Sequence, residues 1–85
     1  MGKEPDPAKA LRLAWGVALR DQRKFVRLSI AEVATAMTEA GHPISAAAIG
    51  MWERGESAPR WHHQFAVAAI LGTTRDRLFN VAEVA

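Results

Sequence analysis

The sequence predicts an all-α domain built from five helices, and three observations support this fold class. Apolar residues recur at spacings of three, four and seven positions along most of the chain, which is the pattern of amphipathic helices. Serines and threonines precede several of these stretches, and glycine or proline follows them, as at capped helix ends. No run alternates apolar and polar residues as a half-buried strand does, and no internal repeat is present.

Length and composition bound the class of protein. The chain has 85 residues, enough for one domain, and its 49% apolar and 24% charged residues are typical of a globular protein. The absence of cysteine excludes disulfides and thiolate metal sites. No apolar run is long enough to span a membrane, and residues 1–10 lack the apolar stretch of a secretory signal, so we expect a cytoplasmic protein.

The first helix is expected after a flexible arm at residues 1–7, which contains two prolines. It opens the domain proper, which we place at residues 8–80, and it should end near residues 25–27. Its apolar face is formed by Leu11, Trp15, Leu19 and Val26.

The second and third helices carry clear start and stop signals. Ser29 and Glu32 fit a capping box that opens a helix over 29–40, and glycine at 41 with proline at 43 prevents its continuation. Ser45 is the next N-cap and opens a helix over 45–54 that ends before Gly55. In that helix Ile49 and Trp52 share a face, which we expect to lie in the core.

Two further helices complete the domain. Pro59 is expected to start the fourth, which ends at Gly72 and carries most of its large apolar residues on one side, namely Trp61, Phe65, Ala68, Ile70 and Leu71. Thr74 can cap a short fifth helix with Leu78 and Phe79 turned inward. Residues 81–85 form a tail without a pattern.

Charge is unevenly distributed along the chain. The net charge is only +2, but seven of the eleven Lys and Arg residues lie in residues 1–27. This asymmetry favours an anionic partner, although a solvated helix face explains it as well.

The segment 29–54, two capped helices around a Gly/Pro turn, is a candidate helix-turn-helix. Around it stand, in chain order, Leu19-Arg20-x-x-Arg23, Leu28-Ser29, Ile44-Ser45, Ile49-x-x-Trp52-Glu53-x-Gly55, Pro59, Ala68-x-x-Leu71-Gly72 and Leu78-Phe79. Over residues 19–79 this order resembles the Cro/cI-type (XRE) helix-turn-helix family of phage and bacterial repressors. One departure is the distance from Ala34 to Ser45, which is eleven residues against about six in short members, so the second helix and its turn are lengthened here.

The resemblance implies a compact, lambda-repressor-like DNA-binding domain whose third helix enters the major groove. By register with the family, its base-contacting positions are Ala46, Ala47, Gly50 and Met51. None of these side chains can form a bidentate hydrogen bond with a base, so we expect contact with thymine methyl groups and close backbone approach.

Other residues are predicted to contact phosphate or to hold the third helix. Helix starts and nearby arginines give the phosphate candidates Arg23, Arg27, Ser29, Ile30, Ser45, Arg54 and Arg60. The resemblance also implies an ion pair between Arg23 and Glu53 that clamps the first helix to the third. The alternative is that these two are independent surface charges.

We expect neither metal nor cofactor nor catalysis. His62 and His63 are adjacent and point about 100° apart on a helix, and His42 lies in a turn, so the histidines read as scattered and not as a zinc site. No phosphate-binding loop, nucleophile motif or close carboxylate pair is present, and no small-molecule ligand or membrane partner is evident.

The sequence thus predicts a transcriptional regulator that binds double-stranded DNA, either as a homodimer or as a monomer that dimerises only on DNA. The fifth helix with Leu78 and Phe79 and residues 81–84, or else the first helix, is the expected dimer surface. Two alternatives remain open: a DNA-binding antitoxin of a toxin–antitoxin pair, and a protein-interaction module that kept the fold and lost DNA binding.

Overall fold

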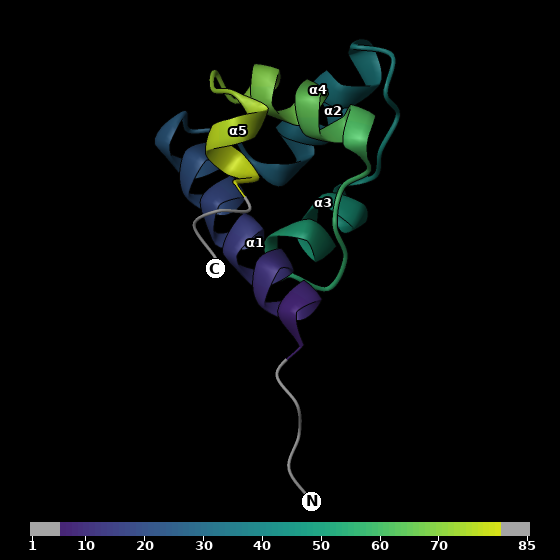
Figure 1. Cartoon of the computed structure of the whole chain (residues 1–85). Coiled ribbons are helices and arrows are strands. Elements are labelled where there is room, and N and C mark those ends of the chain that lie inside the picture. The colour runs from purple at the N-terminus through teal and green to yellow at the C-terminus, as the bar shows by residue number, and fades with distance from the viewer. Residues whose placement is uncertain (1–5, 81–85) are drawn as a thin grey trace, which may run out of the picture.

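A computed structural model describes residues 6–80 of the chain. This part contains five α-helices and no strand (Figure 1), as the sequence predicts: α1 Pro7–Phe25, α2 Ile30–Glu39, α3 Ala46–Glu53, α4 Trp61–Ile70 and α5 Arg75–Leu78. None of these helices is both long enough and apolar enough to cross a bilayer. The expected tail at 81–85 and most of the expected arm lie outside the described residues.

Two predicted boundaries are wrong. The helix α1 begins at Pro7, which the sequence placed in the arm, because the Asp6 side chain accepts hydrogen bonds from the backbone N–H groups of Ala8 and Lys9 and so caps the helix. The helix α4 begins at Trp61 and not at Pro59, and Arg60 occupies its N-cap without a side-chain hydrogen bond. The caps Ser29, Ser45 and Thr74 stand where the sequence placed them.

The helices α1 to α4 end in the same way. In each, the backbone N–H groups of two consecutive residues beyond the last turn fold back onto carbonyls of that turn, and the first of these two residues has a positive φ. That residue is Gly41, Gly55 or Gly72 after α2, α3 and α4, but it is Arg27, with φ 62°, after α1. A non-glycine residue pays a steric cost in this conformation, so Arg27 stands out.

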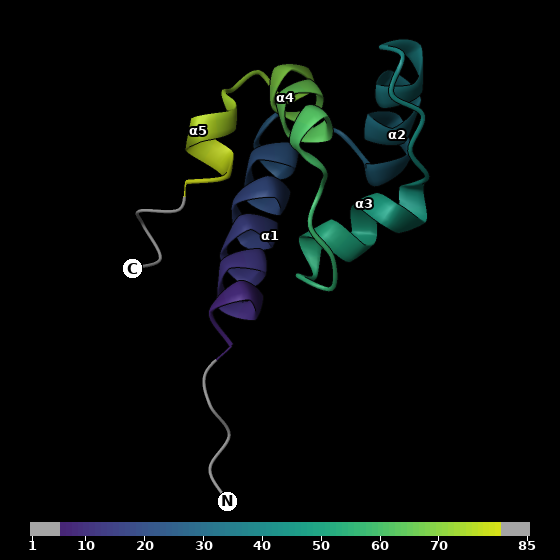
Figure 2. The same ribbon diagram turned by 45° about the vertical axis from the view of Figure 1, so that its right-hand side comes forward.

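The long helix α1 forms the axis of the molecule. Figure 2 shows it between α5 on one side and α3 with α2 on the other, while α4 lies across one end; α1 packs against both α3 and α5. The space between the helices is filled by one apolar core, composed of Leu19, Val33, Met37, Ile49, Trp52, Val67, Ala68, Leu71, Leu78 and Phe79.

The core corrects two expectations about apolar surface. Leu78 and Phe79 are buried, as their inward orientation predicts, and therefore cannot also supply a dimer surface on α5. Trp61 and Phe65 were expected on the packed side of α4, but they are 61% and 51% exposed. They pack instead on each other, with ring centroids 5.2 Å apart in a T-shaped arrangement.

Candidate nucleic-acid interface

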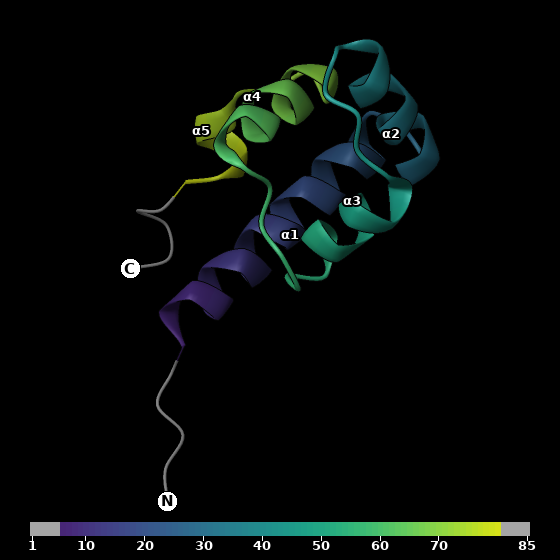
Figure 3. The same cartoon turned by 90° about the vertical axis from the view of Figure 1, so that its right-hand side faces the viewer.

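The helix pair α2–α3 occupies one side of the molecule, and α3 lies against α1 (Figure 3). A turn over residues 40–45 joins the two helices. Ile49 and Trp52 anchor α3 in the core, as predicted, with 1% and 5% of their surfaces exposed. The opposite face of α3 is consequently the face left to solvent.

The C-terminal end of α3 is held to α1 by the ion pair that the resemblance implies. Arg23 Nε lies 2.6 Å from Glu53 Oε2, and Nη2 of the same guanidinium donates to Glu53 Oε1 at 2.9 Å. A third donor, Arg23 Nη1, bonds the carbonyl oxygen of Leu28 at 2.9 Å. The hydrogen bond to Glu53 raises the pKa of Arg23 above its usual value, against the effect of burial. One side chain thus ties together α1, α3 and the segment before α2.

This geometry corrects the second role predicted for Arg23. All three guanidinium nitrogens have partners within the protein, and the side chain is only 13% exposed. A phosphate would have to compete with Glu53 for donors that are already in a bidentate pair. Arg23 is therefore a positioning residue for α3, and only the other predicted arginines remain candidates for phosphate contact.

Two residues that position α3 were missed by the sequence reasoning. A Cβ atom on Gly16 would lie 2.7 Å from the carbonyl oxygen of Trp52 and would overlap that of Glu53, so glycine is needed where α1 and α3 approach. Arg12 Nε donates to the carbonyl oxygen of Gly55 at 3.2 Å and holds the turn after α3. The signal for Gly16 was available, because a glycine inside a helix costs about 1 kcal/mol and calls for a packing reason.

The start of α3 presents small side chains and open backbone donors. The Ser45 hydroxyl accepts from the backbone N–H of Ala48 at 3.1 Å, which leaves the first two N–H groups, those of Ala46 and Ala47, without an intrahelical partner. Ala46, Ala47 and Met51 are exposed, as predicted. A shallow hollow of about 300 Å³ between α2 and this helix start adjoins Ser45 and Ala46.

Gly50 does not lie where the sequence placed it. The residue is buried, and a Cβ atom added there would lie 3.0 Å from Nη1 of Arg54, one turn further along α3. The guanidinium of Arg54 therefore covers the backbone that we expected to be open. Arg54 itself is exposed and pairs with Glu56, which raises the pKa of Arg54 through a hydrogen bond. The exposed face of α3 thus includes a cation that the sequence assigned only to phosphate.

At the start of α2 the expected anion site is partly occupied by the protein. The Ser29 N–H donates to Glu32 Oε1 at 2.8 Å, and the Glu32 N–H donates to Ser29 Oγ at 3.0 Å, which completes the predicted capping box. The hydrogen bond from the Ser29 backbone N–H, and after it the Ser29 hydroxyl beside the carboxylate, lower the pKa of Glu32. The N–H of Ser29 is therefore not open to a phosphate, whereas that of Ile30, in the first turn, has no intrahelical partner.

Two exposed arginines flank these helices. Arg27 precedes α2 and Arg60 precedes α4, and both are exposed. They are the phosphate candidates whose side chains the structure leaves to solvent, together with Arg54. Arg27 has a positive φ of 62°, a backbone conformation that is unfavourable for a residue with a side chain.

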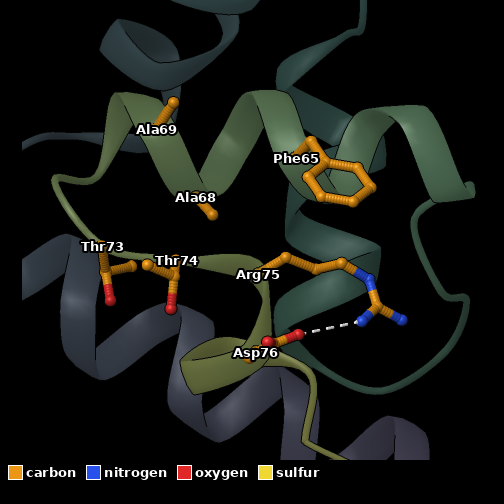
Figure 4. Close-up of a pocket in the computed structure, with 7 residues that line it drawn as sticks. All are labelled: Phe65, Ala68, Ala69, Thr73, Thr74, Arg75 and Asp76. Carbon is orange, nitrogen blue, oxygen red and sulfur yellow. Dashed lines mark hydrogen bonds and ion pairs between the residues drawn. The ribbon is translucent and has the colours of Figure 1, made fainter.

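A second surface feature lies on α4 and α5. Figure 4 shows Phe65 of α4 and Arg75 of α5 beside a shallow pocket of about 350 Å³. The Arg75 guanidinium lies 3.9 Å from the ring centre of Trp61, and its Nε donates to the buried Gln64 at 2.9 Å. The exposed aromatic pair is thus held in place by a cation from the neighbouring helix.

The three histidines are not scattered, which corrects the prediction. The turn after α2 brings His42 to the first turn of α4, where His62 and His63 lie, and ligand nitrogens of the three are within 4.8 Å of one another. Burial, together with His62, His42 and Arg60 nearby, lowers the pKa of His63.

Comparison of the chain with protein-family models, with curated proteins and with solved structures finds no significant match. The resemblance to Cro/cI-type regulators therefore rests on the sequence motifs.

Proposed function

We propose that the protein is a sequence-specific DNA-binding transcriptional regulator of the Cro or immunity-repressor type. The observation that carries this proposal is the exposed face of α3. That face carries small side chains, and Arg54 lies along it. The Arg23–Glu53 pair and the close contact at Gly16 fix the orientation of α3 relative to α1. A helix that is held firmly against its neighbour and exposes a face of small side chains with one arginine can enter the major groove and contact bases.

The residues of this face suit two kinds of base contact. Ala46, Ala47 and Met51 are small or apolar and can pack against thymine methyl groups. Arg54 carries the fork of donors that can bond O6 and N7 of guanine, provided that it exchanges Glu56 for the base. The expected operator therefore combines thymines with at least one guanine per half-site.

Contacts with the DNA backbone would come from exposed arginines and helix starts. Arg27, Arg60 and the open N–H groups at the starts of α2 and α3 can bind phosphate and so set the register of the protein on the duplex. Occupancy of an operator by the protein would then exclude or redirect polymerase. Two chains on a near-palindromic site would place their half-sites about one helical turn apart.

Selection of bound sequences from a random DNA pool, followed by mobility shift at several salt concentrations, tests this function. A defined motif and a steep loss of affinity with salt are expected. Ala47→Glu places a carboxylate on the reading face and should abolish retardation, whereas the matched Ala14→Glu, on the exposed side of α1, should not. No retardation of any duplex at low salt, or equal binding by both variants, would refute the proposal.

A second function is favoured by the aromatic pair on α4. Trp61 and Phe65 expose large rings beside Arg75, and such residues are enriched where proteins bind one another. The protein would then be an interaction module, or an antitoxin that binds both DNA and a toxin. Absence of DNA binding would favour the module, and DNA binding with a protein partner that is lost in Trp61→Ala would favour the antitoxin.

A further inference from the structure

The turn after α2 and the first turn of α4 bring all three histidines of the chain to one place. One ligand nitrogen from each of His42, His62 and His63 can be chosen so that all lie within 4.8 Å of one another. The rings touch, with centroids 4.3 Å apart for His62 and His63 and 5.7 Å and 5.9 Å from His42 to each of them.

The backbone fixes these positions. The N–H of His42 bonds the carbonyl of Met37 at 2.9 Å and that of Gly41 bonds Thr38 at 3.0 Å, so the helix-ending motif of α2 sets where His42 begins. His62 and His63 are the second and third residues of α4, and Gln64 Nε2 bonds the carbonyl of Pro59 at 3.1 Å, which ties the preceding chain to the helix. The helices α2 and α4 pack against each other, so the cluster is held by two anchored elements.

The imidazole nitrogens have no other task within the described part of the chain. Over residues 6–80 none of them donates or accepts a hydrogen bond. These nitrogens are not buried in the core either. Within the described residues, the buried side-chain nitrogen that lacks a hydrogen-bond partner belongs to Trp15 and not to a histidine. His62 is exposed and the other two rings are half-buried, so an ion from solvent can reach the cluster.

Neutral imidazole is a preferred ligand of Zn²⁺ and of neighbouring transition ions. A tetrahedral zinc site with Zn–N bonds of about 2.1 Å places its nitrogens about 3.4 Å apart. The separations here need to shrink by about 1.4 Å at most, which rotation of imidazole side chains can supply because their terminal torsions are broad.

Charges around the cluster act in both directions. The carbonyl end of α2 is favourable to a cation, whereas Arg60 and the amide end of α4 oppose one. All members of the cluster are histidines, so the cluster has no carboxylate that would neutralise the charge of a bound ion. The site therefore depends on three Zn–N bonds, with a fourth position left to solvent.

We propose that His42, His62 and His63 bind one divalent transition-metal ion, with zinc the best fit, and that the ion fastens the turn between α2 and α3 to the start of α4. The three ligands are not among the residues of the proposed DNA contacts. Because the ion binds the folded chain through residues 20 positions apart in sequence, it stabilises the native state by mass action. It also links the start of the reading helix to a second helix, so that metal can stiffen the turn preceding Ser45.

Calorimetric titration of the full chain, without a histidine tag, by ZnCl₂ at neutral pH tests the proposal. We expect one ion per chain and a thermal midpoint that rises with zinc. His62→Gln and His42→Gln should each weaken binding at least about tenfold, since loss of even an outer partner of a zinc ligand costs ten- to a hundredfold. Asp21→Asn, which removes an exposed carboxylate from α1, should bind zinc as the parent chain does.

His62 is exposed, so its variant should keep the metal-free thermal midpoint of the parent, which separates loss of a ligand from loss of the fold. Titration with Co²⁺ gives a second readout, because the intensity of its visible absorption distinguishes four-coordinate from six-coordinate sites. No saturable zinc binding, unchanged affinity in the histidine variants, loss of binding in Asp21→Asn, or a six-coordinate spectrum would each overturn the proposal, whatever the outcome of the DNA experiments.

Discussion

The guanidinium of Arg54 lies over Gly50, in the space where a side chain at residue 50 would begin. Two residues one turn apart on α3 therefore share one piece of the exposed face. The missing side chain of the glycine leaves room for the arginine, and the arginine places its guanidinium there. Base contact at this point of the helix is accordingly expected from Arg54 and not from the Gly50 backbone.

Gly50→Ala separates these two roles. The new methyl group would meet only the flexible end of Arg54, which can shift by a few tenths of an ångström, while α3 gains helix propensity. We expect the free energy of unfolding to rise by about 1 kcal/mol, measured in urea. DNA affinity should change little in this variant and fall in Arg54→Ala. A variant that loses DNA binding while gaining stability would instead return base contact to residue 50.

The Arg23–Glu53 pair should be a major contributor to stability. Both side chains are nearly buried, and truncation of one partner leaves the other charge without a counterion. Glu53→Gln is therefore expected to lower the free energy of unfolding by about 3 kcal/mol in urea denaturation. The matched change is Glu56→Gln, which breaks the solvent-exposed pair with Arg54 and should leave stability almost unchanged. Equal effects of the two changes would contradict a buried clamp.

Arg27→Gly should improve stability and impair function. Arg27 occupies the position that is glycine after α2, α3 and α4, and its φ of 62° costs a side chain about 1 kcal/mol or more. Glycine relieves that cost, partly offset by its greater freedom in the unfolded chain, so stability should rise by up to about 1 kcal/mol. If Arg27 binds phosphate, the slope of log affinity against log salt should fall by about one.

Arg27→Asn provides the control, because asparagine tolerates the left-handed conformation but carries no charge. It should reproduce the loss of salt dependence with a smaller gain in stability. A variant with unchanged salt dependence would show that the arginine is retained for some other reason.

The elements of the fold were predictable because their signals are local. Ser29, Ser45 and Thr74 each cap the helix that the sequence assigned to them, and the spacing of Ile49 and Trp52 correctly places both in the core. Boundaries failed where the signal has two readings. Proline both belongs to flexible arms and starts helices, so Pro7 was assigned to the arm.

The surface was harder to predict, because it depends on contacts between distant residues. Apolar periodicity cannot show that Arg75 packs on the ring of Trp61 while Trp61 remains exposed. Likewise, spacing shows that His62 and His63 diverge on α4, but only packing of α2 on α4 brings His42 to them. The cover of Arg54 over Gly50 depends on one side-chain conformation, which no sequence pattern specifies.

Glu32 links stability, pH and the proposed phosphate contacts at the start of α2. Its carboxylate accepts from the Ser29 N–H, which lowers the pKa of Glu32 in the folded chain. Because the folded pKa lies below the unfolded value, this contribution to stability is complete above the ordinary glutamate range, near pH 4.5, and is lost as pH falls through the lowered pKa. Glu32→Gln should keep the capping hydrogen bond and remove this part of the acid dependence, measured by urea unfolding from pH 3 to 7.

The same change, Glu32→Gln, removes a negative charge beside the Ile30 N–H, so DNA affinity at neutral pH should rise if phosphate binds there. The matched Asp21→Asn, which removes an exposed carboxylate from α1, should alter neither; lower DNA affinity in Glu32→Gln would place the phosphate contact elsewhere.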